Sequence, residues 1–323
     1  MKNTLLSIKN LKTYFPLRSN IFSQRKGFVY AVDDVSLNIE EGEIIGLVGE
    51  SGCGKTTLGR TILKLIEPTE GRIIFRGEEI TSYNSKQMKP IRRKMQMIFQ
   101  DPYSSLNPRM KIGKIISEPL KIHKAASKGD IPKITEELLE TVGLSPEYAN
   151  RYPHEFSGGQ RQRIGIARAI ALKPDLIIAD EPVSALDVSI QAQIVNLMLE
   201  LKEKLNLTYI FISHDLNLVK FISDRVAVMY LGKIVEMGTS EDIYNTPKHP
   251  YTKILLNSSP IPDPKTKRKK IIISGDVPSP VNRPSGCHFH PRCPERMMPL
   301  CSEKAPTLKE IDTGHSVSCL LYE

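Results

Sequence analysis

Tryptophan is absent from the sequence, and Phe, Tyr and Trp together make up 6% of its 323 residues. Long apolar runs are absent too, since no segment approaches the roughly 18 uninterrupted apolar residues that a membrane-spanning helix requires. The N-terminal segment Met1–Lys9 lacks the apolar core and small-residue cleavage site of a secretory signal. No repeat occurs at the periods of about 20–50 residues that are typical of solenoid proteins. We therefore expect a globular protein of the reducing cytoplasm that does not cross a bilayer by itself.

Acidic residues are outnumbered, because 45 Lys and Arg residues stand against 36 Asp and Glu residues and give a formal net charge of +9. Such an excess favours an anionic partner, and a nucleotide, a nucleic acid and the inner membrane leaflet all qualify. Part of the excess lies in the run Lys265–Lys270, which we interpret as a solvated linker rather than a binding patch. Net charge alone does not choose among these partners.

The chain has five cysteines, and their distribution is uneven. Cys53 stands alone, whereas the others are Cys287, Cys293, Cys301 and Cys319. In a reducing compartment, clustered cysteines more often hold metal than form disulfides. Four thiolates are enough for Zn²⁺ or a 4Fe–4S cluster, and the close Cys-x2-Cys pairs that are frequent in zinc sites are absent. From the spacing alone, an iron–sulfur cluster, zinc, and free or disulfide-bonded thiols all stay open.

Short apolar runs indicate the secondary structure of the core. Leu5–Ile8 and Val35–Ile39 are β-rich, and three further runs are typical of strands buried on both faces of a parallel sheet: Ile44–Val48, Leu176–Ala179 and Tyr209–Ile212. Each of the three is followed by a segment of helical character. This alternation predicts an α/β fold.

The composition of the chain changes along its length. Residues from about 101 to 155 are mostly helical in pattern, and Ile134–Val142 carries an apolar face. After residue 240, proline becomes too frequent for long helices or central strands. We expect a domain at 1–240, with a helical subdomain at about 101–170, and a compact, irregular appendage at 241–323.

A complete phosphate-loop pattern follows the run Ile44–Val48 and precedes a helical segment, which is where its mechanism requires it. Its glycines let successive backbone N–H groups point at phosphate oxygens, and the helix adds its positive N-terminal end. Lys55 supplies a charge for the β- and γ-phosphates, and the Thr56 hydroxyl is a ligand for Mg²⁺. Cys53 fills a variable position, which we interpret as packing rather than as a nucleophile. The residues expected to bind nucleotide here are Gly49, Glu50, Ser51, Gly52, Cys53, Gly54, Lys55, Thr56 and Thr57.

Two acids, Asp180 and Glu181, directly follow the apolar run Leu176–Ala179. In a phosphate-loop protein, the end of such a strand places the first acid beside the metal. The second acid, one residue further, can polarise the attacking water. We therefore predict that Asp180 holds Mg²⁺ and that Glu181 is catalytic.

The segment Phe156–Gln160 distinguishes among phosphate-loop proteins, which include kinases, small GTPases, helicases and transport ATPases. Ser157 is a good N-cap, and Gly158 and Gly159 leave N–H groups bare at the start of the next helix, which makes a second anion site. The residues Phe156–Gln160 closely resemble the Leu-Ser-Gly-Gly-Gln signature of the ATP-binding cassette (ABC) family, with Phe156 in place of Leu. This resemblance implies the ABC cassette fold of P-loop NTPases, with a RecA-like core, an antiparallel β subdomain and a helical subdomain.

Further elements of that family match single positions of this chain. Gln100 corresponds to the glutamine that reaches the metal and the attacking water, and His214 to the switch histidine near the γ-phosphate. The loop Ser184–Asp187 corresponds to the one that crosses a dimer interface, so Asp187 joins the nucleotide-binding set. In the family, two cassettes pack head to tail, and each ATP lies between the phosphate loop of one and the signature of the other. ATP hydrolysis therefore implies a dimer.

An aromatic residue near the N-terminus is expected to stack on adenine in this family. Phe15 gives the best alignment, while Tyr14 and Phe28 compete with it. An N-terminal aromatic is often only a core residue, so the sequence leaves these alternatives open.

The resemblance extends beyond the cassette. The stretch Ile98–Arg109, the sequence His249–Thr252 and the cysteine-bearing tail are similar to the ATPase subunits of bacterial oligopeptide and dipeptide importers. The chain resembles the second of their two ATPase subunits. This implies a peripheral ATPase at the cytoplasmic face of the membrane, with a second ATPase subunit, two transmembrane permease subunits and, indirectly, an extracellular solute-binding protein as partners. It also implies ATP and Mg²⁺ as cofactors and a 4Fe–4S cluster in the tail, held by Cys287, Cys293, Cys301 and Cys319.

Other interpretations stay open at this point. Peptides are favoured by resemblance, while related systems carry nickel, glutathione or oligosaccharides, and the dimer is either a homodimer or, as the family favours, a heterodimer. The alternative function is a soluble ABC ATPase that acts on nucleic acid in translation or repair, as the basic charge suggests. Translation-type proteins usually carry two cassettes and repair-type proteins a long coiled coil, and neither occurs here. We therefore expect no nucleic-acid partner.

Overall fold

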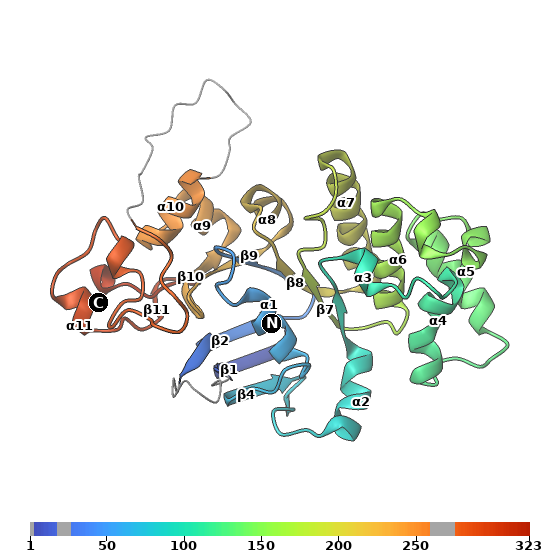
Figure 1. Ribbon diagram of the computed structural model, residues 1–323, viewed down its shortest axis with the longest axis horizontal. Helices are drawn as coiled ribbons and strands as arrows, with labels where there is room; N and C mark the ends of the chain where they lie inside the picture. The colour runs from blue at the N-terminus through green and yellow to red at the C-terminus, as the bar shows by residue number, and fades with distance from the viewer. Residues whose placement is uncertain (1–2, 18–26, 259–274) are drawn as a thin grey trace, which may run out of the picture. The chain divides into compact units, whose positions relative to one another are not determined.

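The computed structural model describes residues 3–17, 27–258 and 275–323 (Figure 1). The basic run Lys265–Lys270 lies outside these residues, so its interpretation as a linker stays a prediction. The chain divides into two compact units, and each is described by itself. The first, called the helical unit here, comprises Met1–Asn3, Glu40–Glu43 and Ser82–Ile212. The second, called the phosphate-loop unit, comprises Thr4–Ile39, Ile44–Thr81 and Ser213–Glu323.

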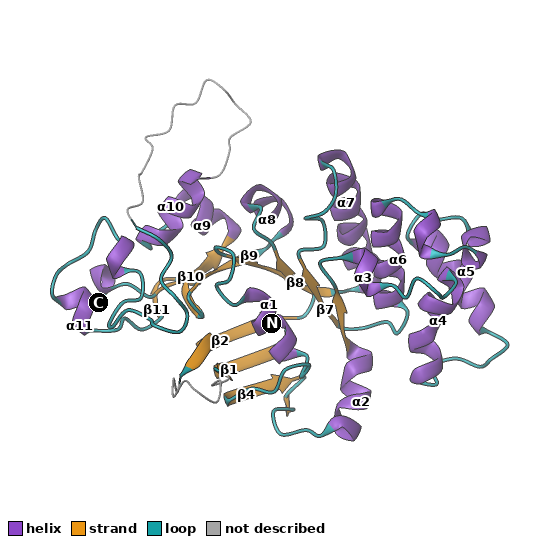
Figure 2. Ribbon diagram, viewed as in Figure 1, coloured by secondary structure: helices purple, strands orange, loops and turns teal. Residues whose placement is uncertain are grey.

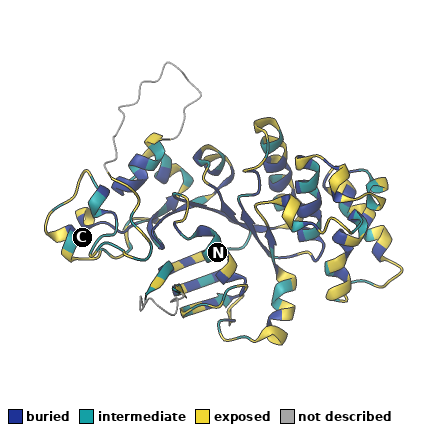
Figure 3. Ribbon diagram, viewed as in Figure 1, coloured by how far each residue is buried: buried dark blue, intermediate teal, exposed yellow. Residues whose placement is uncertain are grey.

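The helical unit is built on three parallel strands in which β7 lies between β6 and β8. Every residue of β7 and β8 is buried, as the dark blue strands in Figure 3 show. Strands buried on both faces have no polar alternation, which is why they stand in the sequence as continuous apolar runs. The two strands expected here are therefore confirmed. The strands are β6 (Met95–Ile98), β7 (Leu176–Asp180) and β8 (Thr208–Ile212).

Helices make up most of the rest of this unit (Figure 2). The expected helix Ile134–Val142 is α5, which begins earlier, at Ile131, and ends before Gly143, whose φ of +72° suits glycine at a helix end. A small core of Leu120, Ala171 and Leu172 holds α5 in place. The helices are α2 (Ser85–Lys94), α3 (Pro102–Ser105), α4 (Ile112–Ile122), α5 (Ile131–Thr141), η1 (Pro146–Asn150), η2 (Pro153–Glu155), α6 (Gly158–Ile170) and α7 (Val188–Leu205).

The phosphate-loop unit contains two groups of strands. One is a four-stranded sheet in the order β2, β1, β4, β5, in which β4 pairs antiparallel with both β1 and β5. In the other, β3 runs parallel to β9, and β10 pairs with β9 antiparallel. All five residues of β3 are buried, as its apolar run predicts. The strands are β1 (Thr4–Pro16), β2 (Phe28–Glu40), β3 (Ile44–Val48), β4 (Glu70–Phe75), β5 (Glu78–Glu79), β9 (Arg225–Tyr230) and β10 (Lys233–Thr239).

This unit also contains helices, of which α1 follows β3 in the chain while α9 and α10 follow β10. They are α1 (Lys55–Ile62), α8 (Leu216–Ile222), α9 (Ser240–Asn245) and α10 (Pro250–Ser258). In the described part of the chain, no helix combines the length and the apolar character needed to cross a membrane.

The C-terminal tail is more regular than its proline content suggests. Besides short turns it contains a hairpin, whose second strand pairs antiparallel with β10 and sets Glu236 opposite Val317. The Glu236 carboxylate, which is fully buried, accepts hydrogen bonds from the backbone N–H groups of Lys248 and His249, and it lies 2.8 Å from Nε2 of His315. These contacts fix the hairpin to the strand. The tail elements are η3 (His290–Arg292), α11 (Leu300–Glu303), β11 (Lys309–Asp312), β12 (His315–Val317) and η4 (Leu320–Tyr322).

Candidate functional site

The phosphate-loop pattern occupies the turn between β3 and α1, as predicted. Gly49 has a φ of +149° and Gly54 a φ of +107°, and residues other than glycine rarely adopt such positive φ angles. A Cβ atom would come within 2.1 Å of the Met229 carbonyl oxygen at Gly49 and within 1.9 Å of the Ala31 carbonyl oxygen at Gly54. Only glycine therefore fits at these two positions, where the loop lies directly against neighbouring backbone.

Lys55 lies inside this loop. Its Nζ donates hydrogen bonds to the carbonyl oxygens of Gly49, at 2.8 Å, and Glu50, at 3.0 Å, and the residue is 5% exposed. Helix α1 begins at Lys55, its N-cap Gly54 has no side chain to occupy the first N–H groups, and its first turn has no acidic residue. The loop therefore joins an ammonium group to a helix N-terminus, a combination that binds phosphate.

Cys53 is buried within the loop, and burial raises the pKa of its thiol. The protonated thiol is a poor nucleophile, which agrees with a packing role. Ser51 and Gly52 are exposed, while Thr56 and Thr57 are half-buried in the first turn of α1.

Asp180 and Glu181 lie at the end of β7 in the helical unit. Asp180 is 1% exposed and pairs with Ile212 in the strand register. Glu181 has a φ of +45°, a left-handed conformation that costs a residue with a side chain on the order of 1–3 kcal/mol. Its Oε2 accepts a hydrogen bond from Nε2 of Gln100 at 2.9 Å. The structure therefore brings together two of the residues that the sequence assigned to catalysis.

The signature segment begins α6. Ser157 is its N-cap and accepts a hydrogen bond from the backbone N–H of Gln160 at 3.3 Å, while the Gln160 side chain accepts one from the N–H of Ser157 at 3.0 Å. This reciprocal capping box confirms the predicted N-cap. A Cβ atom at Gly158 would lie 3.1 Å from Leu186, and one at Gly159 would lie 2.5 Å from Ile190. The two glycines therefore let the loop before α7 and the first turn of α7 pack against the signature.

Gln191 holds that loop and was not predicted from the sequence. Its Nε2 donates to the carbonyl oxygens of Val183, at 3.1 Å, and Leu186, at 2.9 Å. Asp187 is the N-cap of α7, but its side chain makes no capping hydrogen bond. The shape of the loop is thus set by Gln191, a residue of α7, rather than by the N-cap. No short motif in the sequence predicts this role.

His214 lies in the turn before α8 and belongs to the phosphate-loop unit. The turn is held by its neighbours: Asp215 accepts hydrogen bonds from the N–H groups of Asn217 and Leu218, and Ser213 Oγ accepts one from the N–H of Asp215. His214 itself is exposed. The side chains of Ser213 and Asp215 therefore hold the turn that carries His214.

The three aromatic candidates for adenine stacking differ in their surroundings. The Tyr14 hydroxyl donates a hydrogen bond to Asp33, and its ring lies 4.7 Å from that of Tyr30 between centroids. Phe28 also contacts both of these rings, at 6.5 and 6.3 Å. Phe15 is 37% exposed, and among the described residues no aromatic ring contact involves it.

The four late cysteines are all described and all free. Burial, with smaller contributions from other cysteines of the group, raises the pKa of Cys293 to about 12 and that of Cys319 to about 11. The backbone N–H of Cys287 donates to the Cys301 carbonyl oxygen at 2.8 Å. Other cysteines of the group contribute to the raised pKa of Cys287, Cys293 and Cys319, and binding of a thiolate-coordinated group would release the protons of these thiols. Within the described residues, however, no three His, Cys, Asp or Glu side chains are close enough to hold one metal ion.

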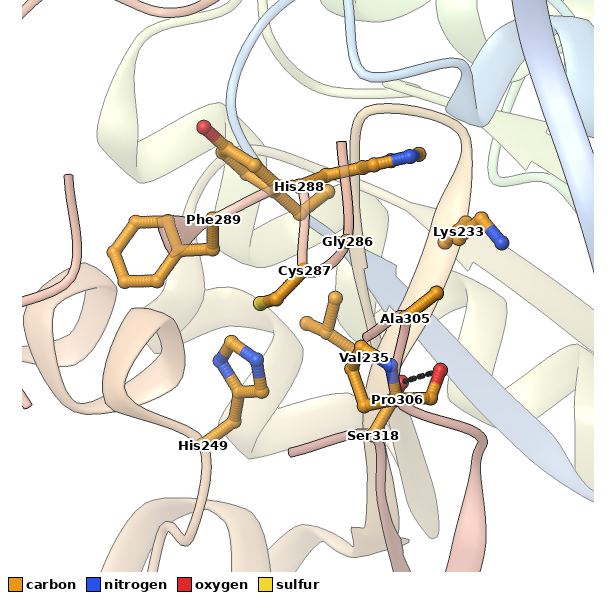
Figure 4. A pocket seen from close by; sticks show the side chains of 11 residues that line it. Lys233, Val235, His249, Gly286, Cys287, His288, Phe289, Ala305, Pro306 and Ser318 are labelled. Carbon is orange, nitrogen blue, oxygen red and sulfur yellow. Dashed lines mark hydrogen bonds between the residues drawn. The ribbon is translucent and has the colours of Figure 1, made fainter. Parts of the chain in front are cut away.

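A small cavity of about 20 Å³ lies beside Cys287 (Figure 4). Figure 4 shows the sulfur of Cys287 directed toward the ring of His249. His249 is fully buried, and burial lowers its pKa to about 3, so its ring is neutral. Its Nδ1 accepts a hydrogen bond from the backbone N–H of Tyr251 at 3.0 Å, which places the proton on Nε2.

Comparisons with known proteins agree with the motifs. A family model for ABC transporters matches residues 32–184, and a model for the oligopeptide/dipeptide transporter C-terminal region matches residues 235–301. The oligopeptide transport ATP-binding protein AppF of Bacillus subtilis (strain 168) is 53% identical over 324 residues, which cover 99% of this chain and 98% of AppF. YkfD of the same organism is 54% identical over 321 residues, which cover 98% of this chain and 95% of YkfD.

A solved structure is similar as well. The dimeric structure of the ATP-binding cassette MJ0796 in a post-hydrolysis state, bound to ADP and Pi, has a TM-score of 0.65 and 30% identity, and the match covers 73% of this chain and 99% of that one. The fold and the motifs thus define an ABC-type P-loop ATPase. At 53% identity over almost the whole of both chains, the chain belongs to the family of oligopeptide transport ATP-binding proteins.

Proposed function

We propose that this chain is the ATP-hydrolysing subunit that energises a peptide importer. The observation that carries the proposal is the phosphate loop with Lys55 enclosed, in a chain that also matches the C-terminal region of oligopeptide and dipeptide transporters. AppF is named for oligopeptide transport, which makes oligopeptides or dipeptides the favoured cargo.

Each predicted site residue has a proposed role in the ATP cycle. Lys55 binds the β- and γ-phosphates, Thr56 and Asp180 hold Mg²⁺, and Glu181 activates the attacking water. Gln100 orients Glu181 and reaches the metal, and their hydrogen bond of 2.9 Å supports this role. His214 approaches the γ-phosphate.

Phe15 is the residue that we propose to stack on adenine. Its exposed ring has no aromatic neighbour among the described residues, whereas Tyr14 and Phe28 pack against Tyr30. A ring that already packs against others is less able to receive a base.

The signature Ser157–Gln160 and Asp187 are proposed to act on the nucleotide of a second cassette. The dimer of MJ0796 supports a dimeric mode of action. We propose that this second cassette is a different ATPase subunit. Two transmembrane permeases then hold the pair at the cytoplasmic face of the membrane, and an extracellular binding protein delivers the solute.

We further propose the domain division expected above, with a nucleotide-binding domain at 1–240 and an appendage at 241–323. Helices α3 to α6 lie between residues 102 and 170, which supports a helical subdomain at about 101–170. The match of the C-terminal region model begins at residue 235, near the proposed boundary.

Peptide uptake by a reconstituted complex tests the proposed function. Proteoliposomes that contain this chain, its partner ATPase and both permeases should accumulate a labelled oligopeptide only when ATP and the binding protein are supplied. ATP-independent accumulation, or none under any condition, would contradict the proposal.

We also propose that Cys287, Cys293, Cys301 and Cys319 hold a 4Fe–4S cluster. The four cysteines all lie in the tail, part of which matches the C-terminal region of oligopeptide and dipeptide transporters, and this supports the proposal. The spacing of the side chains does not favour a single zinc ion, whose sulfur ligands all lie about 2.3 Å from one centre. The role of the cluster would be to tie down a segment that has little regular structure.

Iron content tests the cluster. Protein purified anaerobically should be brown and hold about four irons per chain, as a 4Fe–4S cluster bound by four cysteines requires. Cys293→Ser should lose most of this iron because it removes a ligand, whereas Cys53→Ser, which changes a cysteine outside the group, should retain it. Colourless, iron-free protein from the anaerobic preparation would refute the cluster.

A further inference from the structure

The phosphate loop is held by contacts with residues 241–323, called the C-terminal segment here. Arg292 forms two hydrogen bonds with the carboxylate of Glu50, from Nη1 to Oε2 at 2.8 Å and from Nη2 to Oε1 at 2.9 Å. The side chain of Arg292 is 6% exposed and that of Glu50 25%. A paired arrangement of guanidinium and carboxylate with little solvent around the cation is both stronger and more directional than a surface ion pair.

A second contact reaches the same residue. The backbone N–H of Glu50 donates a hydrogen bond to the Tyr251 hydroxyl at 2.9 Å. The main chain and the side chain of Glu50 are therefore both occupied by residues of the C-terminal segment, one from α10 and one from η3. Glu50 directly follows Gly49, whose carbonyl oxygen accepts a hydrogen bond from Lys55, so the position of Glu50 bears on that of the phosphate-binding lysine.

Arg292 is itself fixed by packing. Its backbone N–H donates to the carbonyl oxygen of Phe289, and the buried Phe289 ring lies 5.2 Å from the ring of Tyr230 and 5.4 Å from that of Tyr251 between centroids. Tyr230 and Tyr251 lie 4.7 Å from each other. This aromatic cluster joins the two residues that hold Glu50 and limits the movement of both.

The same turn lies between two of the late cysteines. The N–H of His290 donates to the carbonyl oxygen of Cys287, and the N–H of Cys293 to that of His290. Arg292 lies in this turn, directly before Cys293 in the sequence. The cysteine-bearing turn and the loop that binds phosphate belong to one packed structure within the phosphate-loop unit.

We propose that Arg292 and Tyr251 are positioning residues for ATP binding, which hold the phosphate loop in its binding conformation through Glu50. The proposal rests on the assignment of the phosphate loop to ATP. Neither residue needs to touch the nucleotide. A loop held in place before binding loses less conformational freedom when it binds. The contacts of Arg292 and Tyr251 with Glu50, called the clamp here, should therefore raise the affinity for ATP more than the rate of the chemical step.

Variants of the full chain separate this role from simple structural support. Arg292→Gln and Glu50→Gln should each raise the Kd for MgATP about three- to tenfold in calorimetric titration. In the assembled importer, KM for ATP should rise by a similar factor while kcat stays within about twofold. The double variant should be no weaker than either single variant, because both remove the same interaction. Arg292→Lys should recover part of the affinity, since it keeps the charge but not the two parallel hydrogen bonds.

Arg296→Gln is the matched control, because Arg296 is an exposed arginine of the same segment. It should bind MgATP with unchanged affinity. Suppose that Lys55→Ala loses ATP binding, so that the assignment of the loop holds. Unchanged affinity in Arg292→Gln, or additive losses in the double variant, would then overturn the positioning role of Arg292. Retained ATP binding in Lys55→Ala would instead overturn the assignment of the loop. Should Arg292→Gln fail to fold, Arg292→Lys and Glu50→Gln carry the same comparison.

Discussion

Lys55→Ala should weaken MgATP binding by about 100-fold or more, because the phosphates lose their main counter-ion. Truncating one partner of a buried charge pair typically costs about 2–5 kcal/mol, and each 1.4 kcal/mol is tenfold in affinity. In the structure, the Lys55 ammonium lies within the loop, where it donates hydrogen bonds to the carbonyl oxygens of Gly49 and Glu50. Titration calorimetry with MgATP on the full chain measures the loss directly.

Lys9→Ala provides the comparison, since Lys9 is an exposed lysine of β1 in the same unit. Its affinity for MgATP should equal that of the unchanged chain. Tight binding in Lys55→Ala would show that the loop between β3 and α1 is not the phosphate site.

Glu181→Gln should separate binding from hydrolysis. The glutamine keeps the size of the side chain and an acceptor for Nε2 of Gln100, but it cannot take a proton from the attacking water. General base catalysis typically contributes about 10²–10⁴-fold, so turnover should fall by that factor while MgATP still binds. The variant should therefore accumulate as a nucleotide-trapped dimer with its partner ATPase, which size-exclusion chromatography with bound ATP detects.

Glu200→Gln is the control for this substitution, because Glu200 is an exposed carboxylate of α7 in the same unit. It should hydrolyse ATP at the ordinary rate. Unchanged turnover in Glu181→Gln would remove the proposed catalytic role of Glu181 and leave the φ of +45° at this residue without a functional reason.

Local motifs predicted much of the candidate site, because their chemistry depends on neighbours in the chain. The glycines, the lysine and the flanking elements of the loop Gly49–Thr56 are neighbours in the chain, so its pattern is complete in the sequence. The same holds for the capping box of Ser157 and for β3, β7 and β8, whose burial on both faces leaves continuous apolar runs. The structure confirms the place of the loop between β3 and α1, the capping box and the burial of the three strands.

Contacts between distant residues were not predictable in this way. Arg292 is separated from Glu50 by 242 residues, and neither residue type is unusual where it stands. The hairpin of β11 and β12 was missed because its strands are short and mostly polar and lie within a proline-rich tail, which has no apolar run to reveal them. Tertiary pairing, rather than local propensity, creates these features.

The rate of ATP hydrolysis by the assembled importer tests the central claim most directly. The complex of this chain, its partner ATPase and the permeases, in proteoliposomes, should hydrolyse ATP several times faster when the binding protein loaded with oligopeptide is present than when it is absent. The Glu181→Gln complex should lose both the basal and the stimulated rate. A hydrolysis rate that does not respond to the peptide-loaded binding protein would contradict the proposed role in peptide import.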